Sequence, residues 1–316
     1  MQHHLNRRRF LGAAIGTGAA AATAGSWAPA AGAQAGGNAL GSVPSNRIGI
    51  QLYSLRRLMP NGDRRAVRSV LNWLGRAGYT EVEMAGYYEF TAAQVRGWVD
   101  DAGLRAASGH DGLNLDHAST TWKDEYKKTL EGANTLGQQF TGVAWHPGPH
   151  DTERYKQLAQ RFNEAGQLAQ AAGLQFFYHN HDFEFANKQA DGITPLYDIL
   201  LDETNASLVK FELDLYWIVV GGESPVDYLS RDPARYPLYH VKDKTWKDRP
   251  NENDWEDVGP GAIDFPDIFA AGQGRRLDKR FIIEHDWPLL SHPDDPKNAE
   301  YKTAQTGLNY LRAVRW

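Results

Sequence analysis

The sequence contains no cysteine, so disulfides, thiol nucleophiles and thiolate metal sites are excluded. It also has no excess of positive charge: lysine and arginine number 34 against 39 acidic residues, which gives a net charge of −5. Without the three arginines of the first 35 residues, the net charge is −8. Proteins that bind nucleic acids usually present a basic surface to the phosphates. We therefore expect no nucleic-acid partner.

Long hydrophobic runs are missing as well. The apolar stretch near the N-terminus falls short of the roughly 18 residues that a membrane span needs, and the mean hydropathy of the chain is −0.56. With 41% hydrophobic and 23% charged residues, the composition is that of a globular protein. We expect a folded chain with no membrane span once its leader is removed.

The first 35 residues have the composition of that leader. Three consecutive arginines, at 7–9, precede a short stretch rich in alanine and glycine, which ends in small residues suited to cleavage. The arginines and the Phe-Leu pair after them resemble a bacterial twin-arginine signal. We predict a leader over residues 1–35, a flexible linker over 36–46 and a folded domain over 47–316, with export to the periplasm. The cleavage position stays open.

The rest of the chain alternates eight times between short apolar or β-branched runs and segments of helical periodicity. The runs predict strands at residues 48–53, 80–84, 105–110, 140–145, 174–179, 209–214, 238–241 and 280–284. Between them, segments such as 64–77 and 153–172 repeat apolar residues at helical spacing. Eight such units predict a single (β/α)8 TIM barrel. A doubly wound sheet is the alternative, but no Gly-x-Gly-x-x-Gly turn follows the first strand.

Histidines and charged residues gather where the predicted strands end. Of the nine histidines after residue 35, six lie there: His110, His146, His179, His181, His240 and His285. The charged residues at such positions are Glu83, Glu184, Asp214, Lys242, Asp243, Glu284 and Asp286. Any one of these histidines alone is more readily structural. Because barrel enzymes build their active sites at the carboxyl ends of the strands, the clustering predicts a site there.

Four of these side chains predict a metal site: His179, Asp214, His240 and Glu284, from four successive strands. Neighbouring strands lie about 5 Å apart, so the four can converge on one point. A mixed nitrogen and oxygen set suits Mn²⁺, Co²⁺, Zn²⁺ or Fe²⁺. A hydrogen-bonded network without metal is the alternative, although ionisable groups at buried strand ends are costly to leave unpaired. We predict one divalent metal ion of unknown identity.

These motifs resemble the xylose isomerase-like TIM barrels, and in particular an exported branch of the sugar phosphate isomerase/epimerase family. The resemblance covers the chain from about residue 48 to the C-terminus and rests on the segments YHNHDFEF at 178–185, FELDLYW at 211–217, HVKD at 240–243 and VGPGAID at 258–264. That superfamily includes sugar phosphate isomerases and epimerases, inosose dehydratases and metal-dependent apurinic endonucleases. The resemblance therefore implies a barrel, a divalent metal and a sugar or keto-sugar substrate.

One position departs from the family pattern. In the family's epimerases, the ligand on the fifth strand is a glutamate that also serves as a base, whereas His179 stands at the matching position here. The resemblance to inosose dehydratases, which carry histidine-rich sequence at this point, favours elimination or hydration. Glu184, five residues further on, is a second candidate for the ligand or the base.

The chemistry implied is proton abstraction next to a carbonyl, through an enediolate that the metal stabilises. We predict that Glu284 or Glu184 takes the proton and that His181 or Lys242 returns one. The main prediction is a metal-dependent sugar isomerase or epimerase. The alternative is a lyase or hydratase acting on 3-keto-sugars or 3-keto-glycosides, because expulsion of a leaving group proceeds from the same enediolate.

Three further side chains, His110, His146 and Trp217, are predicted to bind the substrate.

His110 and the segment 145–150 also resemble ligand segments of the apurinic endonucleases, but the negative charge and the export signal argue against a nuclease. A periplasmic sugar-binding module that has lost its catalytic activity is a third possibility. The identity of the sugar, its phosphorylation and any homo-oligomer stay open.

Overall fold

The computed structural model describes residues 41–246, 254–272 and 278–316. Eight parallel strands form one sheet: β1 (Ile48–Gln51), β2 (Glu81–Met84), β3 (Arg105–Gly109), β4 (Phe140–Val143), β5 (Gln175–His179), β6 (Val209–Asp214), β7 (Leu238–Val241) and β8 (Arg280–Ile283). Their order is β3-β2-β1-β8-β7-β6-β5-β4. A parallel bridge between His110 and Gly142 joins the two ends of this sheet. The predicted (β/α)8 barrel is confirmed.

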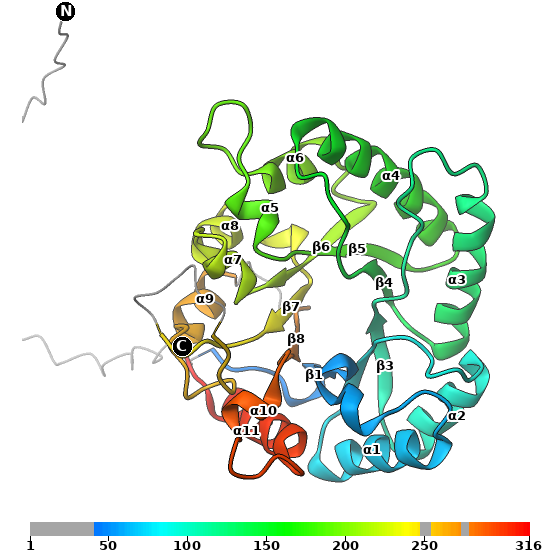
Figure 1. Ribbon diagram of the computed structural model, residues 1–316, viewed down its shortest axis with the longest axis vertical. Helices are drawn as coiled ribbons and strands as arrows, with labels where there is room; N and C mark the ends of the chain where they lie inside the picture. The colour runs from blue at the N-terminus through cyan, green and yellow to red at the C-terminus, as the bar shows by residue number, and fades with distance from the viewer. Residues whose placement is uncertain (1–40, 247–253, 273–277) are drawn as a thin grey trace, which may run out of the picture. The chain divides into compact units, whose positions relative to one another are not determined.

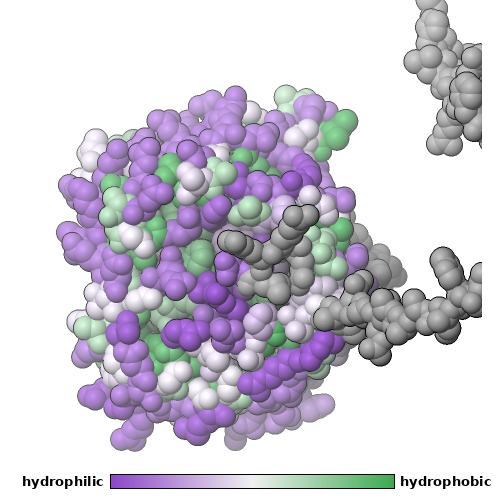
Figure 2. Space-filling view, turned by 180° about the vertical axis from the view of Figure 1, so that it is seen from behind, coloured by the Kyte–Doolittle hydropathy of each residue, from purple (hydrophilic) through white to green (hydrophobic). Residues whose placement is uncertain are grey.

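Helices follow the strands and surround them (Figure 1). The longer ones are α1 (Arg64–Ala77), α2 (Ala92–Asp101), α3 (Trp122–Leu136), α4 (Thr152–Ala171), α6 (Leu196–Glu203), α8 (Pro225–Arg231), α9 (Phe265–Ala271) and α11 (Ala299–Ala313). Short helices follow β5, β6 and β8: α5 (Phe183–Ala186), α7 (Trp217–Val220) and α10 (Pro288–Ser291). In the part of the chain that the structure describes, no helix has the length and apolar character to cross a bilayer. Figure 2 shows hydrophilic residues over most of one face, with hydrophobic residues in small separate groups.

Helix α1 illustrates how the local sequence sets these elements. It begins at Arg64 because the Asp63 side chain accepts a hydrogen bond from the backbone N–H of Ala66 at 2.9 Å. It ends at Ala77 because Gly78 adopts a left-handed conformation with φ of 101°. Four apolar side chains at helical spacing are buried against the barrel: Val67, Val70, Leu71 and Leu74. Burial of each contributes about 2 kcal/mol.

The interior of the barrel is built in layers, because alternate residues of a strand point to the same side. Phe177, Leu238 and Ile282 form an apolar cluster inside it. Two residues further along the same strands come His179, His240 and Glu284. The strands therefore change from an apolar floor to ionisable side chains as they approach their carboxyl ends.

The folded domain begins earlier than the predicted boundary at residue 47. Gly41 donates its backbone N–H to the carbonyl of Trp316 at 2.7 Å, Ser42 pairs with Arg315 as an isolated β-bridge, and Val43 is buried. The prediction of a flexible linker is therefore wrong for residues 41–46, which the chain's last residues hold in place. The predicted leader lies outside the described residues.

A single carboxylate organises the loop between β7 and α9. Asp243 accepts the backbone N–H groups of Lys244, Gly259, Gly261 and Ile263, at 2.9 to 3.1 Å. A Cβ placed on Gly261 would lie only 2.2 Å from Asp243 Cγ, so the backbone approaches the carboxylate as closely as glycine allows. This contact fixes the loop beside the carboxyl end of β7.

We expect Asp243→Ala to lower the free energy of unfolding by about 3 kcal/mol, since buried N–H groups lose a charged acceptor. Asp264→Ala is the matched control, because Asp264 caps α9 through a single backbone N–H and its loss costs about 1 kcal/mol. Urea denaturation of both variants measures the difference. Equal losses in the two variants would show that Asp243 does not organise the loop.

Candidate active site

A cavity of about 610 Å³ opens at the carboxyl ends of the strands. Six of the predicted site residues line it: His110, His179, His181, Trp217, Lys242 and Glu284. Aromatic side chains complete much of its wall: Tyr53, Trp145, Phe183, Trp255 and Trp287. Its position matches the face on which barrel enzymes place their active sites.

The four predicted metal ligands converge at the floor of this cavity. His179, Asp214, His240 and Glu284 each offer one nitrogen or oxygen atom, and these atoms all lie within 4.8 Å of one another. His179 Nε2 is 3.2 Å from Asp214 Oδ2, and His240 Nδ1 is 2.9 Å from Glu284 Oε2. All four side chains are buried. The structure therefore brings together the residues that the strand ends predicted.

The orientation of His240 fits a metal ligand. Its Nδ1 atom is buried and makes no hydrogen bond with any described residue, although Glu284 Oε2 is 2.9 Å away. Two ligand atoms that lie this close without forming a hydrogen bond can both point at a cation bound between them. Nitrogen and oxygen ligands bind zinc tetrahedrally at about 2.0–2.2 Å, which places neighbouring ligand atoms roughly 3.3 Å apart. The donor set can therefore hold a divalent cation.

In each of the two histidines, the ring nitrogen that does not face the ligand cluster lies within hydrogen-bond distance of an oxygen atom. Metal-binding histidines usually have such a partner. His179 Nδ1 lies 2.9 Å from the carbonyl oxygen of Ala144, which can only accept, so Nε2 presents its lone pair toward Asp214. His240 Nε2 lies 2.7 Å from Glu83 Oε1 and 3.1 Å from Glu212 Oε2. Such partners fix the tautomer and the ring orientation of a ligating histidine.

Lys242 lies between the ligand carboxylates and the cavity. Its Nζ atom is 2.8 Å from Glu284 Oε2, 3.0 Å from Asp214 Oδ2 and 3.1 Å from Asp286 Oδ2. Burial lowers the pKa of a lysine, but the charges of these three carboxylates raise the pKa of Lys242 well above its usual value. Lys242 therefore carries a positive charge next to the position that a substrate would occupy.

A protein-family model described as "xylose isomerase-like TIM barrel" matches residues 71–314. The chain belongs to this family. Among curated relatives, inosose dehydratase of Clostridium beijerinckii is 26% identical over 196 residues, which are 56% of this chain and 63% of that protein. Inosose dehydratase of Lacticaseibacillus casei is 25% identical over 180 residues, covering 52% of this chain and 57% of that protein. The chain thus spans less than two thirds of the length of these relatives.

Solved structures of xylose isomerase-like barrels show the same fold. A sugar phosphate isomerase/epimerase from Parabacteroides distasonis has a TM-score of 0.67 and 26% identity, covering 88% of this chain and 97% of that one. The IOLI protein, solved with a bound zinc atom, has a TM-score of 0.60 and 14% identity, covering 84% and 96%. Both structures share the barrel fold of this chain over more than four fifths of its length.

A second polar cluster lies beneath the proposed ligands in this barrel and includes Glu212, a residue that the sequence analysis missed. Glu83, His110, Glu212 and His240 also bring one ligand atom each within 4.8 Å of one another. His110 Nε2 is 2.9 Å from Glu212 Oε2, and Gln51 Nε2 donates to Glu83 Oε1 at 2.7 Å. Glu83 Oε1 is hydrogen-bonded by both Gln51 Nε2 and His240 Nε2, whereas His240 Nδ1 in the other cluster has no hydrogen-bond partner among the described residues, so we interpret this cluster as a support for His240 rather than as a metal site.

The pKa values of the two glutamates of this cluster shift in opposite directions. Burial would raise the pKa of Glu83, but the charges of His110 and His240 lower it to about 2. Burial and the neighbouring Glu83 charge raise the pKa of Glu212 well above its usual value. Both glutamates face His240 Nε2, and an oxygen of either one is close enough to accept its proton.

We expect the double variant Glu83→Gln/Glu212→Gln to bind a divalent metal 10- to 100-fold more weakly, because His240 then has no carboxylate to hold its ring. Glu81→Gln is the matched control: Glu81 is buried on the same strand but pairs with Arg280 at 3.1 Å and not with His240. Competition with a fluorescent chelator measures both affinities. An unchanged affinity in the double variant would contradict the supporting role of the cluster.

Two side chains of the cavity have unused polar atoms. His181 Nδ1 and Trp217 Nε1 are buried and find no hydrogen-bond partner among the described residues. The two rings lie side by side, with centroids 5.4 Å apart, and both line the cavity. The roles of His181 in proton transfer and of Trp217 in substrate binding stay predictions, and both side chains lie in the cavity.

Glu184 is not placed as predicted. Its carboxyl group is fully buried, bonded to the Tyr178 hydroxyl and to the backbone N–H of His181, and it does not line the cavity. Burial raises the pKa of Glu184 to about 8. Helix α5 turns the side chain into the core, away from the cavity, and the role of Glu184 as a base or a metal ligand stays a prediction that this position does not favour.

His146 is not placed as predicted either. Its ring is buried and packs edge-on against Phe183 and Tyr155, with centroids 5.4 and 5.1 Å away, and it does not line the cavity. The structure does not bring His146 into the cavity, and its binding of a substrate stays a prediction. His110 does line the cavity, but its Nε2 atom is already bonded to Glu212.

Proposed function

We propose that this protein is a divalent-metal-dependent lyase that eliminates water or an alcohol from a keto-sugar. The observation that carries the proposal is the convergence of His179, Asp214, His240 and Glu284, with Lys242 beside them, at the floor of an aromatic-lined cavity. The relatives named inosose dehydratase support the same class of reaction.

The residues that would hold the metal are His179, Asp214, His240 and Glu284. When bound there, a divalent ion acts as a Lewis acid toward the carbonyl oxygen of the substrate and favours the enediolate that forms from it. The deep position of these ligands and the aromatic wall keep bulk water away from the reacting atoms.

Glu284 and Lys242 supply the proton transfers in the proposed reaction. The Glu284 carboxylate takes the proton from the carbon next to the carbonyl, and the electron pair of that C–H bond forms a double bond to the carbonyl carbon, which leaves the negative charge on the carbonyl oxygen. When the C=O bond re-forms, that electron pair moves to a double bond between the α and β carbons, the bond from the β carbon to its oxygen breaks, and Lys242 Nζ–H protonates the departing oxygen. Because Glu284 Oε2 and Lys242 Nζ are 2.8 Å apart, the proton on Glu284 can return to Lys242 and complete the cycle.

The placement of the acids favours elimination over epimerisation. Inverting a carbon centre requires a base on each face of the sugar, and the family's second glutamate is replaced here by His179. Glu184 cannot substitute for it, because its carboxyl group is buried against Tyr178. A base and an acid on one side of the substrate suit a syn elimination.

The experiment is to incubate the metal-loaded protein in D₂O with 3-keto-glucose, methyl 3-keto-glucosides and inosose, and to record the products by NMR. We expect loss of the β oxygen and deuterium incorporation next to the carbonyl. Deuterium exchange or inversion with the β oxygen retained would instead indicate an isomerase or epimerase. The absence of both exchange and elimination would contradict the proposal.

A further inference from the structure

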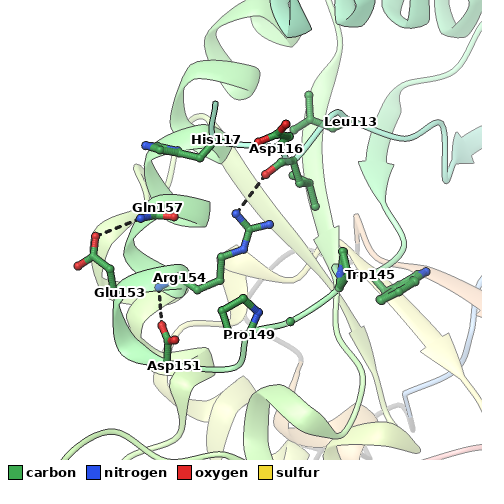
Figure 3. Close-up of a pocket in the computed structure, with 12 residues that line it drawn as sticks. Leu113, Asp116, His117, Trp145, Pro149, Asp151, Glu153, Arg154 and Gln157 are labelled. Atoms are coloured by element: carbon green, nitrogen blue, oxygen red, sulfur yellow. Dashed lines mark hydrogen bonds between the residues drawn. The ribbon is translucent and has the colours of Figure 1, made fainter. Parts of the chain in front are cut away.

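A second cavity of about 690 Å³ lies beside the active-site cavity, on the side of β4. Trp145, which follows β4 by two residues and is 53% exposed, lines both. The second cavity lies between the loop after β3, at 113–117, and the first turns of α4 (Figure 3). Both volumes fall within the range of roughly 300–1,000 Å³ that ligand sites occupy.

The lining of the second cavity suits a neutral ligand with both apolar faces and hydroxyl groups. Its apolar walls are formed by Leu113, Leu115, Trp145, Pro147 and Pro149. Its polar groups are Asp116, His117, Asp151, Glu153, Arg154 and Gln157. Because three carboxylates surround a single guanidinium, a phosphate or another anion is disfavoured there. A sugar ring, which has hydroxyl groups at its edge and C–H groups on its faces, matches this lining.

Arg154 provides a fixed donor within this cavity. Its Nη1 atom donates to the carbonyl of Leu115 at 3.1 Å, which holds the guanidinium in place. Its Nε atom is buried and has no hydrogen-bond partner among the described residues. In Figure 3 the guanidinium lies between Trp145 on one side and His117 and Gln157 on the other. A ligand that crosses from Trp145 toward α4 would therefore pass along Arg154.

Three exposed aromatic rings line the first cavity, and one of them, Trp145, also lines the second. Tyr53, Trp145 and Trp287 line the first cavity and are 44%, 53% and 50% exposed. Large aromatic side chains are costly to leave in water, and their flat apolar faces pack well on other apolar surfaces. The exposed indole of Trp145, at the boundary of the two cavities, can therefore pack on a sugar ring that occupies the second one.

We propose that the second cavity is a subsite for a second sugar ring, so that the substrate is a disaccharide or a larger glycoside whose keto-sugar ring occupies the metal cavity. This inference rests on the proposed function for the identity of the reacting ring. Trp145 stands at the boundary between the two subsites, where the glycosidic bond passes.

The test is isothermal titration calorimetry of the metal-loaded protein with maltose, cellobiose and trehalose, each compared with glucose. We expect at least one disaccharide to bind about 10-fold more tightly than glucose. Gln157→Trp places an indole in the second cavity from α4 and is expected to remove that preference while leaving glucose binding unchanged. Gln167→Trp is the matched control, because Gln167 is an exposed residue of the same helix, about three turns further along.

The two proposals can fail separately, because these unoxidised sugars report binding without turnover. The subsite is overturned if none of the three disaccharides binds, or if none binds more tightly than glucose. It is also overturned if Gln157→Trp keeps the preference for a disaccharide. Neither result affects a lyase activity measured on methyl 3-keto-glucosides. A disaccharide preference that Gln157→Trp abolishes supports the subsite even where keto-sugar turnover is absent, in which case the proposed reaction alone is contradicted.

Discussion

His240→Ala is expected to lower the affinity for a divalent metal by more than 100-fold and to reduce kcat by about 10³-fold or more. Loss of a residue that only supports a ligand already costs 10- to 100-fold in affinity, and removal of one group that stabilises a developing oxyanion costs about 10²–10³ in rate. His240 is central to the cluster, since its Nδ1 atom faces Glu284 and Asp214 while Nε2 faces Glu83.

The measurement is metal content by elemental analysis together with the rate of keto-sugar elimination. His146→Ala is the control, because His146 is also a fully buried histidine after a strand end but lies outside the cluster. We expect that control to lose stability and to retain its metal. Full metal content in His240→Ala would contradict the proposed ligand set.

Lys242→Met is expected to lower kcat by about 10²–10⁴-fold, the usual contribution of a general acid, and to leave the metal bound. Methionine keeps an unbranched chain of similar length but cannot protonate a leaving oxygen. The Lys242 ammonium lies 3.0 Å from Asp214 Oδ2 and 2.8 Å from Glu284 Oε2, so it competes with a cation for the same carboxylates. Its removal should therefore maintain or strengthen metal binding.

Metal content and single-turnover rates of Lys242→Met separate these effects. Lys244→Met is the matched control: Lys244 is equally buried but pairs with Asp254 at 2.6 Å and does not line the active-site cavity. We expect the control to retain its kcat. A Lys242→Met protein that loses its metal would show that Lys242 only supports the cluster, and an unchanged kcat would rule it out as the acid.

Much of the barrel could be predicted because its strands are short, apolar and bounded by polar residues. The structure gives β6 and β7 the predicted bounds, whereas β1 ends two residues early, where a 3₁₀ helix begins at Leu52. The four proposed metal ligands could be located because they end successive strands. Glu212 could have been found by the same logic, since it precedes Asp214 by two residues and so faces the same side of β6.

The directions of side chains beyond the strand ends could not be predicted. Glu184 and His146 both follow strands, yet each turns into the core, Glu184 through the Tyr178 hydroxyl and His146 through the rings of Tyr155 and Phe183. Sequence position alone does not show that Tyr178 binds Glu184 or that Tyr155 packs on His146. The second cavity was missed for the same reason, because it forms between two loops. The leader and the export it implies stay predictions.

The most direct test of the account is anomalous diffraction from crystals of the metal-loaded protein, collected at the absorption edge of the bound ion. We predict one strong peak about 2.0–2.3 Å from ligand atoms of His179, Asp214, His240 and Glu284. A peak between Glu83 and Glu212 instead, or no peak at either cluster, would contradict the claim that this site is the catalytic metal centre.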